Sequence, residues 1–159
     1  MVLNIPMIDS HRAYVNAVAA ALTAAGVPII DIDVLDDMWD DGEPIRGALT
    51  LIDATRTAAA YPDRQVWAEW DERSGWDLSV FDRAANCIEP KHSLCAEVLP
   101  APADVAAATV AVLAAHPSAS TTLQRPVLNR DDWNEALEEG LDAYTRAAQE
   151  GTAALRATP

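Results

Sequence analysis

Hydrophobic and polar residues at the start of the chain repeat with the period of an α-helix. Apolar side chains recur every three or four residues between Tyr14 and Ala25, so they would form one buried stripe. Ser10 is a favourable N-cap, while Gly26 and Pro28 are residues typical of a helix end and the turn after it. The pattern predicts a helix that begins near Ser10 and ends before Gly26.

Between Val27 and Leu99 the period changes to two, which is typical of β-strands. The first expected strand has apolar side chains at Ile30, Ile32 and Val34 and acidic ones at Asp31 and Asp33. A polar connection over 36–44 and a second strand over 45–52 follow. Residues 53–64 suggest only a short helical turn, and a last strand over 91–99 alternates less regularly.

The most definite strand prediction is a hairpin formed by residues 65–71 and 76–81. A three-residue loop of Arg73, Ser74 and Gly75 would join the two strands, with Gly75 in the left-handed conformation. This pairing places six apolar side chains on one face, namely Val66, Ala68, Trp70, Trp76, Leu78 and Val80. Loop length and apolar pattern therefore agree on which face of the hairpin is buried.

Two helices are expected after the strands. The first opens at Ala101–Asp104 and ends before Pro117, and the second begins near Asn129. The second helix would bury Trp133, Leu137, Leu141, Tyr144 and Ala148, and would expose Glu138, Asp142 and Arg146.

This element order predicts an α+β fold of two layers, with an N-terminal helix, an antiparallel sheet of four to five strands and two C-terminal helices. Residues 1–117 would form the core, 118–128 a linker and 129–159 a helix that packs on the core, making one domain overall.

Composition limits the classes of partner. The chain has 25 acidic and 11 basic residues, for a net charge of −14. Direct binding to nucleic acid or to an anionic membrane needs a basic surface, so neither is expected. We expect a cytoplasmic protein, because no leader sequence and no apolar run near the roughly 20 residues of a membrane span is visible. Cys87 and Cys95 are expected to be free thiols.

Two stretches carry a family resemblance. They are Trp70-Asp71-Glu72-Arg73-Ser74-Gly75-Trp76 and Val98-Leu99-Pro100-Ala101-Pro102-Ala103-Asp104-Val105-Ala106. Together with the opening helix, they resemble a family of small actinobacterial proteins of unknown function, over about residues 11–117. The resemblance implies a bacterial, cytosolic setting and assigns no activity or catalytic residue.

No metal or other cofactor is expected. Seven acidic residues lie within 31–43, but their spacing does not match a calcium-binding EF-hand loop, so a solvated acidic face is the simpler interpretation. Cys87, His92 and Cys95 supply at most three zinc ligands and include no closely spaced pair.

A candidate binding site lies on the second face of the predicted hairpin. Strict alternation places Trp67, Glu69 and Asp71 there, with Asp77 and Phe81 from the partner strand. An aromatic ring among carboxylates suits a cation, a basic peptide or a second subunit. The alternative is that the segment 53–64 covers this face as a second layer.

Three classes of function follow from these observations. The first is a non-catalytic interaction or regulatory module whose partner is a basic protein or a second copy of the chain in a homodimer. The second is a small enzyme or small-molecule binder that uses the carboxylates of the same face. The third is a DNA mimic, because residues 31–97 contain sixteen acids and six bases and so carry ten of the fourteen net negative charges. No phosphate-binding or nucleophile motif assigns a catalytic residue.

Overall fold

The computed structural model describes residues 10–40, 42–89, 92–115 and 135–156. Its helices are α1 (Arg12–Ala24), α2 (Ala54–Thr57), α3 (Pro102–Ala115) and α4 (Glu135–Arg156). Its strands are β1 (Ile29–Asp40), β2 (Glu43–Ile52), β3 (Arg64–Asp71), β4 (Gly75–Asp82), β5 (Cys87–Ile88) and β6 (His92–Ser93).

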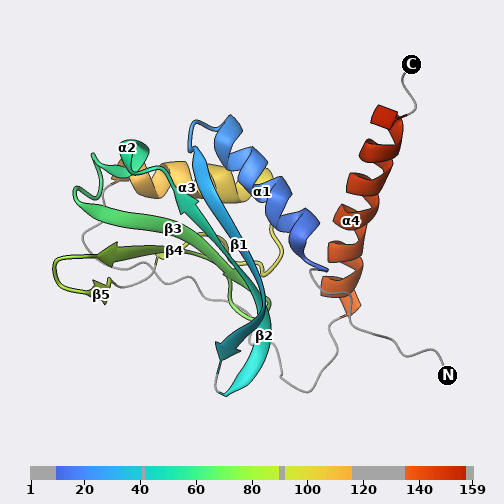
Figure 1. The fold of residues 1–159 in the computed structure, drawn as a ribbon, viewed down its shortest axis with the longest axis horizontal. Coiled ribbons are helices and arrows are strands. Elements are labelled where there is room, and N and C mark those ends of the chain that lie inside the picture. The colour runs from blue at the N-terminus through green and yellow to red at the C-terminus, as the bar shows by residue number, and fades with distance from the viewer. Residues whose placement is uncertain (1–9, 41, 90–91, 116–134, 157–159) are drawn as a thin grey trace.

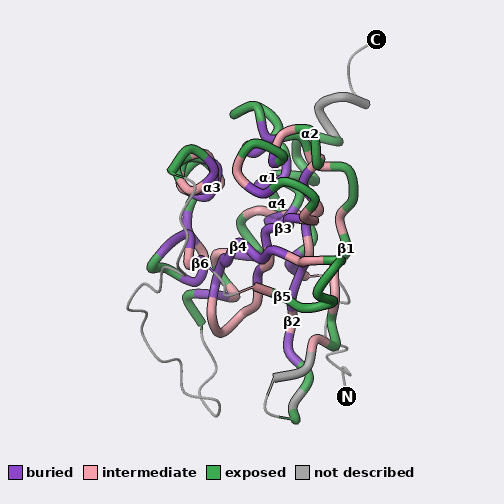
Figure 2. The backbone as a smooth tube through the Cα atoms, turned by 90° about the vertical axis from the view of Figure 1, so that its left-hand side faces the viewer, coloured by how far each residue is buried: buried purple, intermediate pink, exposed green. Residues whose placement is uncertain are grey.

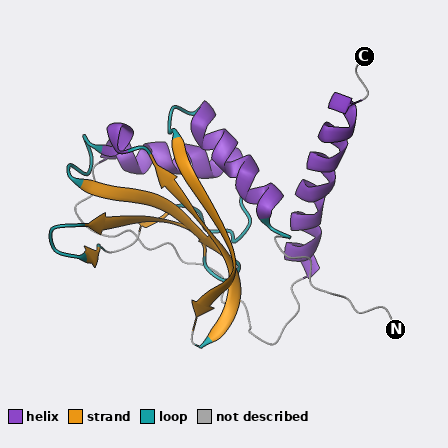
Figure 3. Ribbon diagram, viewed as in Figure 1, coloured by secondary structure: helices purple, strands orange, loops and turns teal. Residues whose placement is uncertain are grey.

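The fold is α+β, as predicted. Strands β1 to β5 follow one another in an antiparallel sheet, and β6 pairs with β4 beside β5. Helices α1 and α3 pack on one face of the sheet (Figures 1 and 3). Within the described residues the sheet therefore has six strands where four to five were predicted, and two of the six are only two residues long.

The β1–β2 hairpin is longer than the alternation predicted. Residues 36–44, expected as a polar connection, mostly continue the two strands, with Asp40 opposite Glu43. A register shift between Leu35 and Met38 interrupts the pairing, and the hairpin extends past the rest of the sheet (Figure 1). Asp36 and Asp37 are both exposed at the register shift, so no apolar alternation marks the continuation of β1 there.

The β3–β4 hairpin confirms the predicted faces. Gly75 has a φ of +77°, as expected for the left-handed conformation. Its loop begins one residue earlier than predicted, at Glu72, because Asp71 pairs with Gly75. The pairing differs from the expected register by two residues, and an even shift leaves every side chain on its predicted face.

The predicted strand over 91–99 is mostly absent from the sheet. Only β6 pairs with β4 in the described part of this segment, and the chain then continues as a buried connection. Leu94, Cys95 and Val98 nevertheless belong to the core. Their apolar character reflects burial rather than strand pairing, which explains why the alternation was irregular.

The core centres on two tryptophans and a tyrosine. Trp70 and Trp76 lie opposite each other on β3 and β4, and both are fully buried with Tyr14 of α1. The Tyr14 hydroxyl donates to the Pro100 carbonyl at 2.8 Å and accepts from Trp76 Nε1 at 3.0 Å. Trp70 Nε1 donates to the Val98 carbonyl at 2.8 Å. Every polar atom of these three side chains therefore has a partner, so their burial carries no unpaired donor.

Among the residues of α4 whose burial is described, those that pack on the other elements lie in its first half. Leu137 and Leu141 are buried and Tyr144 is half-buried, but all residues from Arg146 to Thr152 are exposed. Ala148 was predicted to be buried and is exposed, because α4 points away from the other helices beyond this point (Figure 1). The predicted linker and helix start, including Asn129 and Trp133, lie outside the described residues.

One ion-pair cluster joins α4 to the sheet. Arg46 of β2 bonds Glu72 at 2.7–2.8 Å, Ser10 Oγ at 2.9 Å and both carboxylate oxygens of Glu138 on α4. Glu138 was expected to face solvent and instead pairs with a residue 92 positions earlier. The prediction failed because helical spacing says nothing about an isolated partner on a distant strand.

We expect Arg46→Met to lower the free energy of unfolding by about 2 kcal/mol, because two partly buried carboxylates lose their counter-charge. Hydrogen exchange measured by mass spectrometry should show faster exchange in α4 than in the wild type. Arg64→Met is the matched control, since Arg64 pairs with Asp82 and Glu89 at the rim of the sheet. Equal loss of α4 protection in both variants would show that Arg46 does not hold the helix.

Candidate functional site

The sheet face opposite α1 and α3 carries a distinct set of side chains, here called the open face. Cross-strand pairing arranges most of them in two rows, one of Asp31, Leu51, Trp67 and Ser79 and one of Asp33, Leu49, Glu69 and Asp77. Phe81 and Ile88 form a further pair on the same face. Among the described residues, no helix lies over this face (Figure 3).

The segment 53–64 does not cover the open face. Tyr61 is buried in the core cluster together with Val66, which faces the helices, and Thr57 of α2 is buried as well. The expectation of a second layer built from this segment is therefore wrong. The apolar residues of the segment were needed to close the core on the helix side.

The structure brings two of the predicted site residues into direct contact. The rings of Trp67 and Phe81 stack with their centroids 6.3 Å apart and their planes inclined by 28°. Glu69 lies one row away, where its Oε2 accepts a hydrogen bond from Ser79 Oγ at 3.0 Å. These three side chains form the centre of the open face.

The other two predicted site residues are used within the fold. The Asp71 carboxylate accepts from the backbone N–H groups of Arg73 at 2.9 Å and Ser74 at 2.6 Å, so it closes the hairpin turn. Asp77 lies opposite Glu69 and is only 9% exposed. Of the three predicted carboxylates, Glu69 is the one whose printed partner is a side chain of the open face, Ser79.

A shallow pocket on the open face adds residues that the sequence did not assign. It has a volume of about 220 Å³ and is lined by Asp31, Asp33, Leu49, Leu51, Gln65 and Trp67; we call it the Trp67 pocket. Trp67 Nε1 itself is buried, with no hydrogen-bond partner in the described part of the chain. Alternation along β1 had placed Asp31 and Asp33 on a polar face. Their position near Trp67 follows from the pairing of β1 with β2 and of β2 with β3, which alternation does not predict.

Charge and apolar surface occur together on the open face. None of its positions on the described strands holds a lysine or arginine, while Asp31 and Asp33 are exposed at one side. At the other side Ile88 is 58% exposed next to Phe81. Carboxylates around a tryptophan provide both charge and a π-face for a cation, and exposed apolar residues are typical of protein interfaces.

The histidine and cysteines noted in the sequence lie elsewhere. His92 pairs with Leu78 on the helix side, where burial lowers the pKa of its imidazole. Cys95 is buried and Cys87 is exposed, and neither of them forms a disulfide. Within the residues described, no three histidine, cysteine, aspartate or glutamate side chains are grouped to hold a metal ion. None of the described helices combines the length and apolar character that crossing a membrane requires.

Comparison with known proteins gives a family and no activity. No curated protein and no solved structure matches the chain. The model of the family described as "Family of unknown function (DUF6292)" matches residues 14–111. That range includes all the open-face residues and both stretches behind the resemblance, whereas α4 lies beyond it. Because the match spans more than half of the chain, the protein belongs to this family of unknown function, DUF6292.

Proposed function

We propose that this protein is a non-catalytic interaction module that binds an arginine- or lysine-bearing segment of a basic partner protein through the open face. The observation that carries the proposal is the Trp67 pocket, where two exposed aspartates lie beside a tryptophan and two leucines. A guanidinium or ammonium group placed over Trp67 would gain about 0.5–2 kcal/mol from the ring. Its aliphatic stem would pack on Leu49 and Leu51.

The rest of the molecule supports the same kind of partner. A net charge of −14 attracts a basic protein over distance and repels an acidic one. The apolar residues Leu49, Leu51, Trp67, Phe81 and Ile88 cross the sheet from β2 to β5 and offer area that a small ion would not use. A homodimer through this face would oppose acids to acids, so a basic partner is the better match.

We also propose the bacterial cytoplasm as the setting of this interaction. The resemblance to small actinobacterial proteins implies a bacterial cytoplasm, and a regulatory role in complex with a basic protein would fit that compartment. The match to DUF6292 over residues 14–111 supports the part of the resemblance that assigns the chain to a family of unknown function.

The test uses nona-arginine as a defined probe in calorimetric titrations at 0.15 M salt, where distant surface charges are screened. We expect Trp67→Ala and Asp33→Asn each to weaken binding about tenfold, since each removes part of the cation pocket. Asp142→Asn on α4 makes the same charge change on an exposed residue away from the pocket and should change affinity less than twofold. Equal losses in all three variants would contradict the proposal, because they would show binding by net charge alone.

The alternatives predict different outcomes of related experiments. An enzyme using the open-face carboxylates should turn over a small molecule and lose that activity in Glu69→Gln. A DNA mimic should displace DNA from a DNA-binding protein and be released by high salt. Either result, without Trp67-dependent binding of the basic peptide, would replace the interaction module as the assigned function.

A further inference from the structure

We infer that the basic partner segment binds as an additional β-strand on the outer edge of β1, with its side chains entering two pockets on opposite sides of that strand. The inference rests on the proposed function and specifies how the partner is held. It follows from three features of β1, namely its free edge, the hollow on each side of it and its charge.

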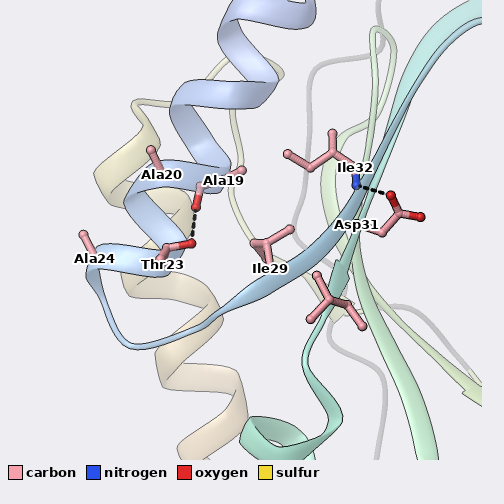
Figure 4. A pocket seen from close by; sticks show the side chains of 8 residues that line it. Ala19, Ala20, Thr23, Ala24, Ile29, Asp31 and Ile32 are labelled. Atoms are coloured by element: carbon pink, nitrogen blue, oxygen red, sulfur yellow. Dashed lines mark hydrogen bonds between the residues drawn. The ribbon is translucent and has the colours of Figure 1, made fainter.

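The first feature is a long edge. Strand β1 runs for 12 residues at the end of the sheet and pairs only with β2 among the described residues. None of its residues from Ile29 to Met38 is fully buried (Figure 2). The Ile32 N–H donates to the carboxylate of Asp31 at 3.0 Å (Figure 4). This N–H is therefore bonded to an exposed side chain rather than to β2, and a strand added at this edge would replace the carboxylate as its partner.

The second feature is an apolar groove between α1 and β1, on the helix side. It has a volume of about 690 Å³ and is lined by Ala19, Ala20, Thr23, Ala24, Ile29, Ile30, Asp31 and Ile32. The small side chains of α1 leave open space above the strand (Figure 4). Ile30, beside the register shift of β1, is 59% exposed at this groove. The groove therefore suits aliphatic side chains of an extended segment.

The Trp67 pocket lies on the opposite side of the same strand. Asp31 borders both hollows, which places them next to each other across β1. Successive side chains of a strand point to opposite faces. A segment added at this edge would therefore direct every second side chain toward the apolar groove and the others toward Asp31, Asp33 and Trp67. The matching sequence alternates aliphatic and basic residues.

The third feature, charge, decides between a partner and a second copy. Asp31, Asp33 and Asp37 are exposed along β1. Pairing two copies of β1 would set like charges opposite each other, which destabilises a strand pair, whereas a basic strand would form opposite-charge pairs. The occupant is therefore a basic strand of another protein.

The experiment titrates isotope-labelled protein with blocked nine-residue peptides and follows backbone amide shifts by NMR. The first peptide alternates arginine and valine, and the second has the same composition in two blocks. We expect the alternating peptide to bind at least about tenfold more tightly, because several backbone hydrogen bonds and both pockets are used only in register. The largest shifts should fall in β1 and in residues 19–24 of α1.

Backbone methylation of the peptide separates strand addition from binding by side chains alone. Two further peptides carry N-methyl groups either on all arginines or on all valines. Because alternate N–H groups of a strand point to opposite edges, only one of the two sets faces β1. We expect one methylated peptide to lose binding at least about tenfold and the other to stay within about twofold of the parent. Equal effects of the two methylations would overturn strand addition.

Protein variants distinguish the failure of this inference from that of the proposed function. Ala20→Trp fills the groove and should weaken the alternating peptide about tenfold while leaving nona-arginine binding unchanged. Asn16→Trp places the same side chain on an exposed position of α1 outside the groove and should have no effect. If nona-arginine binding depends on Trp67 but Ala20→Trp changes nothing, strand addition is wrong and the proposed function stands. If Trp67→Ala weakens the binding of no peptide, the proposed function and strand addition are both wrong. Sedimentation that showed two copies of this chain pairing through β1 would also overturn the inference.

Discussion

Trp70→Ala is expected to lower the free energy of unfolding by about 3–5 kcal/mol, the range found when a large buried aromatic side chain is truncated. Trp70 is fully buried opposite Trp76, and its ring lies 5.5 Å from that of His11 and 5.9 Å from that of Tyr14. Truncation would open a cavity at the centre of the core. It would also remove the hydrogen bond that the Trp70 indole N–H donates to the Val98 carbonyl oxygen at 2.8 Å. Urea denaturation followed by circular dichroism measures the loss.

Two comparisons make this prediction specific. Trp70→Phe keeps most of the ring volume and should cost less than the alanine variant. Trp67→Ala removes the same side chain from the half-exposed open face and should cost about 1–2 kcal/mol, since less apolar area leaves the interior. If Trp67→Ala destabilised as much as Trp70→Ala, Trp67 would be a structural residue and its assignment to a binding surface would fail.

Gly75→Ala is expected to lower the free energy of unfolding by about 2–4 kcal/mol. Gly75 has a φ of +77°, a conformation that costs other residues about 1–2 kcal/mol. A Cβ at this position would also lie 2.8 Å from the Glu97 carbonyl oxygen and 3.1 Å from Val98 Cα, both parts of the backbone. The 97–98 segment would have to move away from the hairpin, which weakens the core around Trp70.

Gly26→Ala provides the matched control. Gly26 has a φ of +83° after α1, but no atom lies within 4 Å of the position a Cβ would take. Gly26→Ala should therefore lower the free energy of unfolding by about 1 kcal/mol, through backbone conformation alone. Thermal unfolding of both variants tests the difference, and equal losses would show that the contact with Glu97 and Val98 is unimportant.

Trp70→Ala and Gly75→Ala also affect the binding site, because both residues lie in the β3–β4 hairpin. Trp70 and Gly75 hold the register in which Trp67 lies opposite Ser79 and Phe81 lies opposite Gln65. A shift by one residue would turn Trp67 toward the helices and remove it from the open face. The core on one side of the sheet thus determines which side chains the other side offers to a partner.

Much of this hairpin could be predicted from sequence because its information is local. Alternation follows from the pleat of a single strand, so Trp67, Glu69 and Phe81 were assigned to the face that the structure shows. The hairpin's burial pattern and the left-handed Gly75 were also predicted. The limits of α1 and the overall α+β order came from helical periodicity and end signals of the same local kind.

The functions of individual carboxylates could not be predicted in this way. Asp71 and Glu69 occupy equivalent alternating positions on β3, yet Asp71 closes the turn and Glu69 bonds Ser79. Glu138 has the spacing of an exposed helical residue and pairs with Arg46 on a distant strand. Each outcome depends on which donor lies within about 3 Å, and that distance is set by the packing of the whole domain.

The sequence by itself therefore determined the class of fold, the hairpin that carries Trp67 and the acidic character of the surface. Tertiary structure alone decided that Asp31 and Asp33 join Trp67 in one pocket, that β1 is an edge strand and that α1 leaves a groove beside it. The physical reason is that periodicity fixes the direction of a side chain relative to its own strand. Neighbours across a sheet depend instead on which distant segments pair, and that is a property of the folded chain.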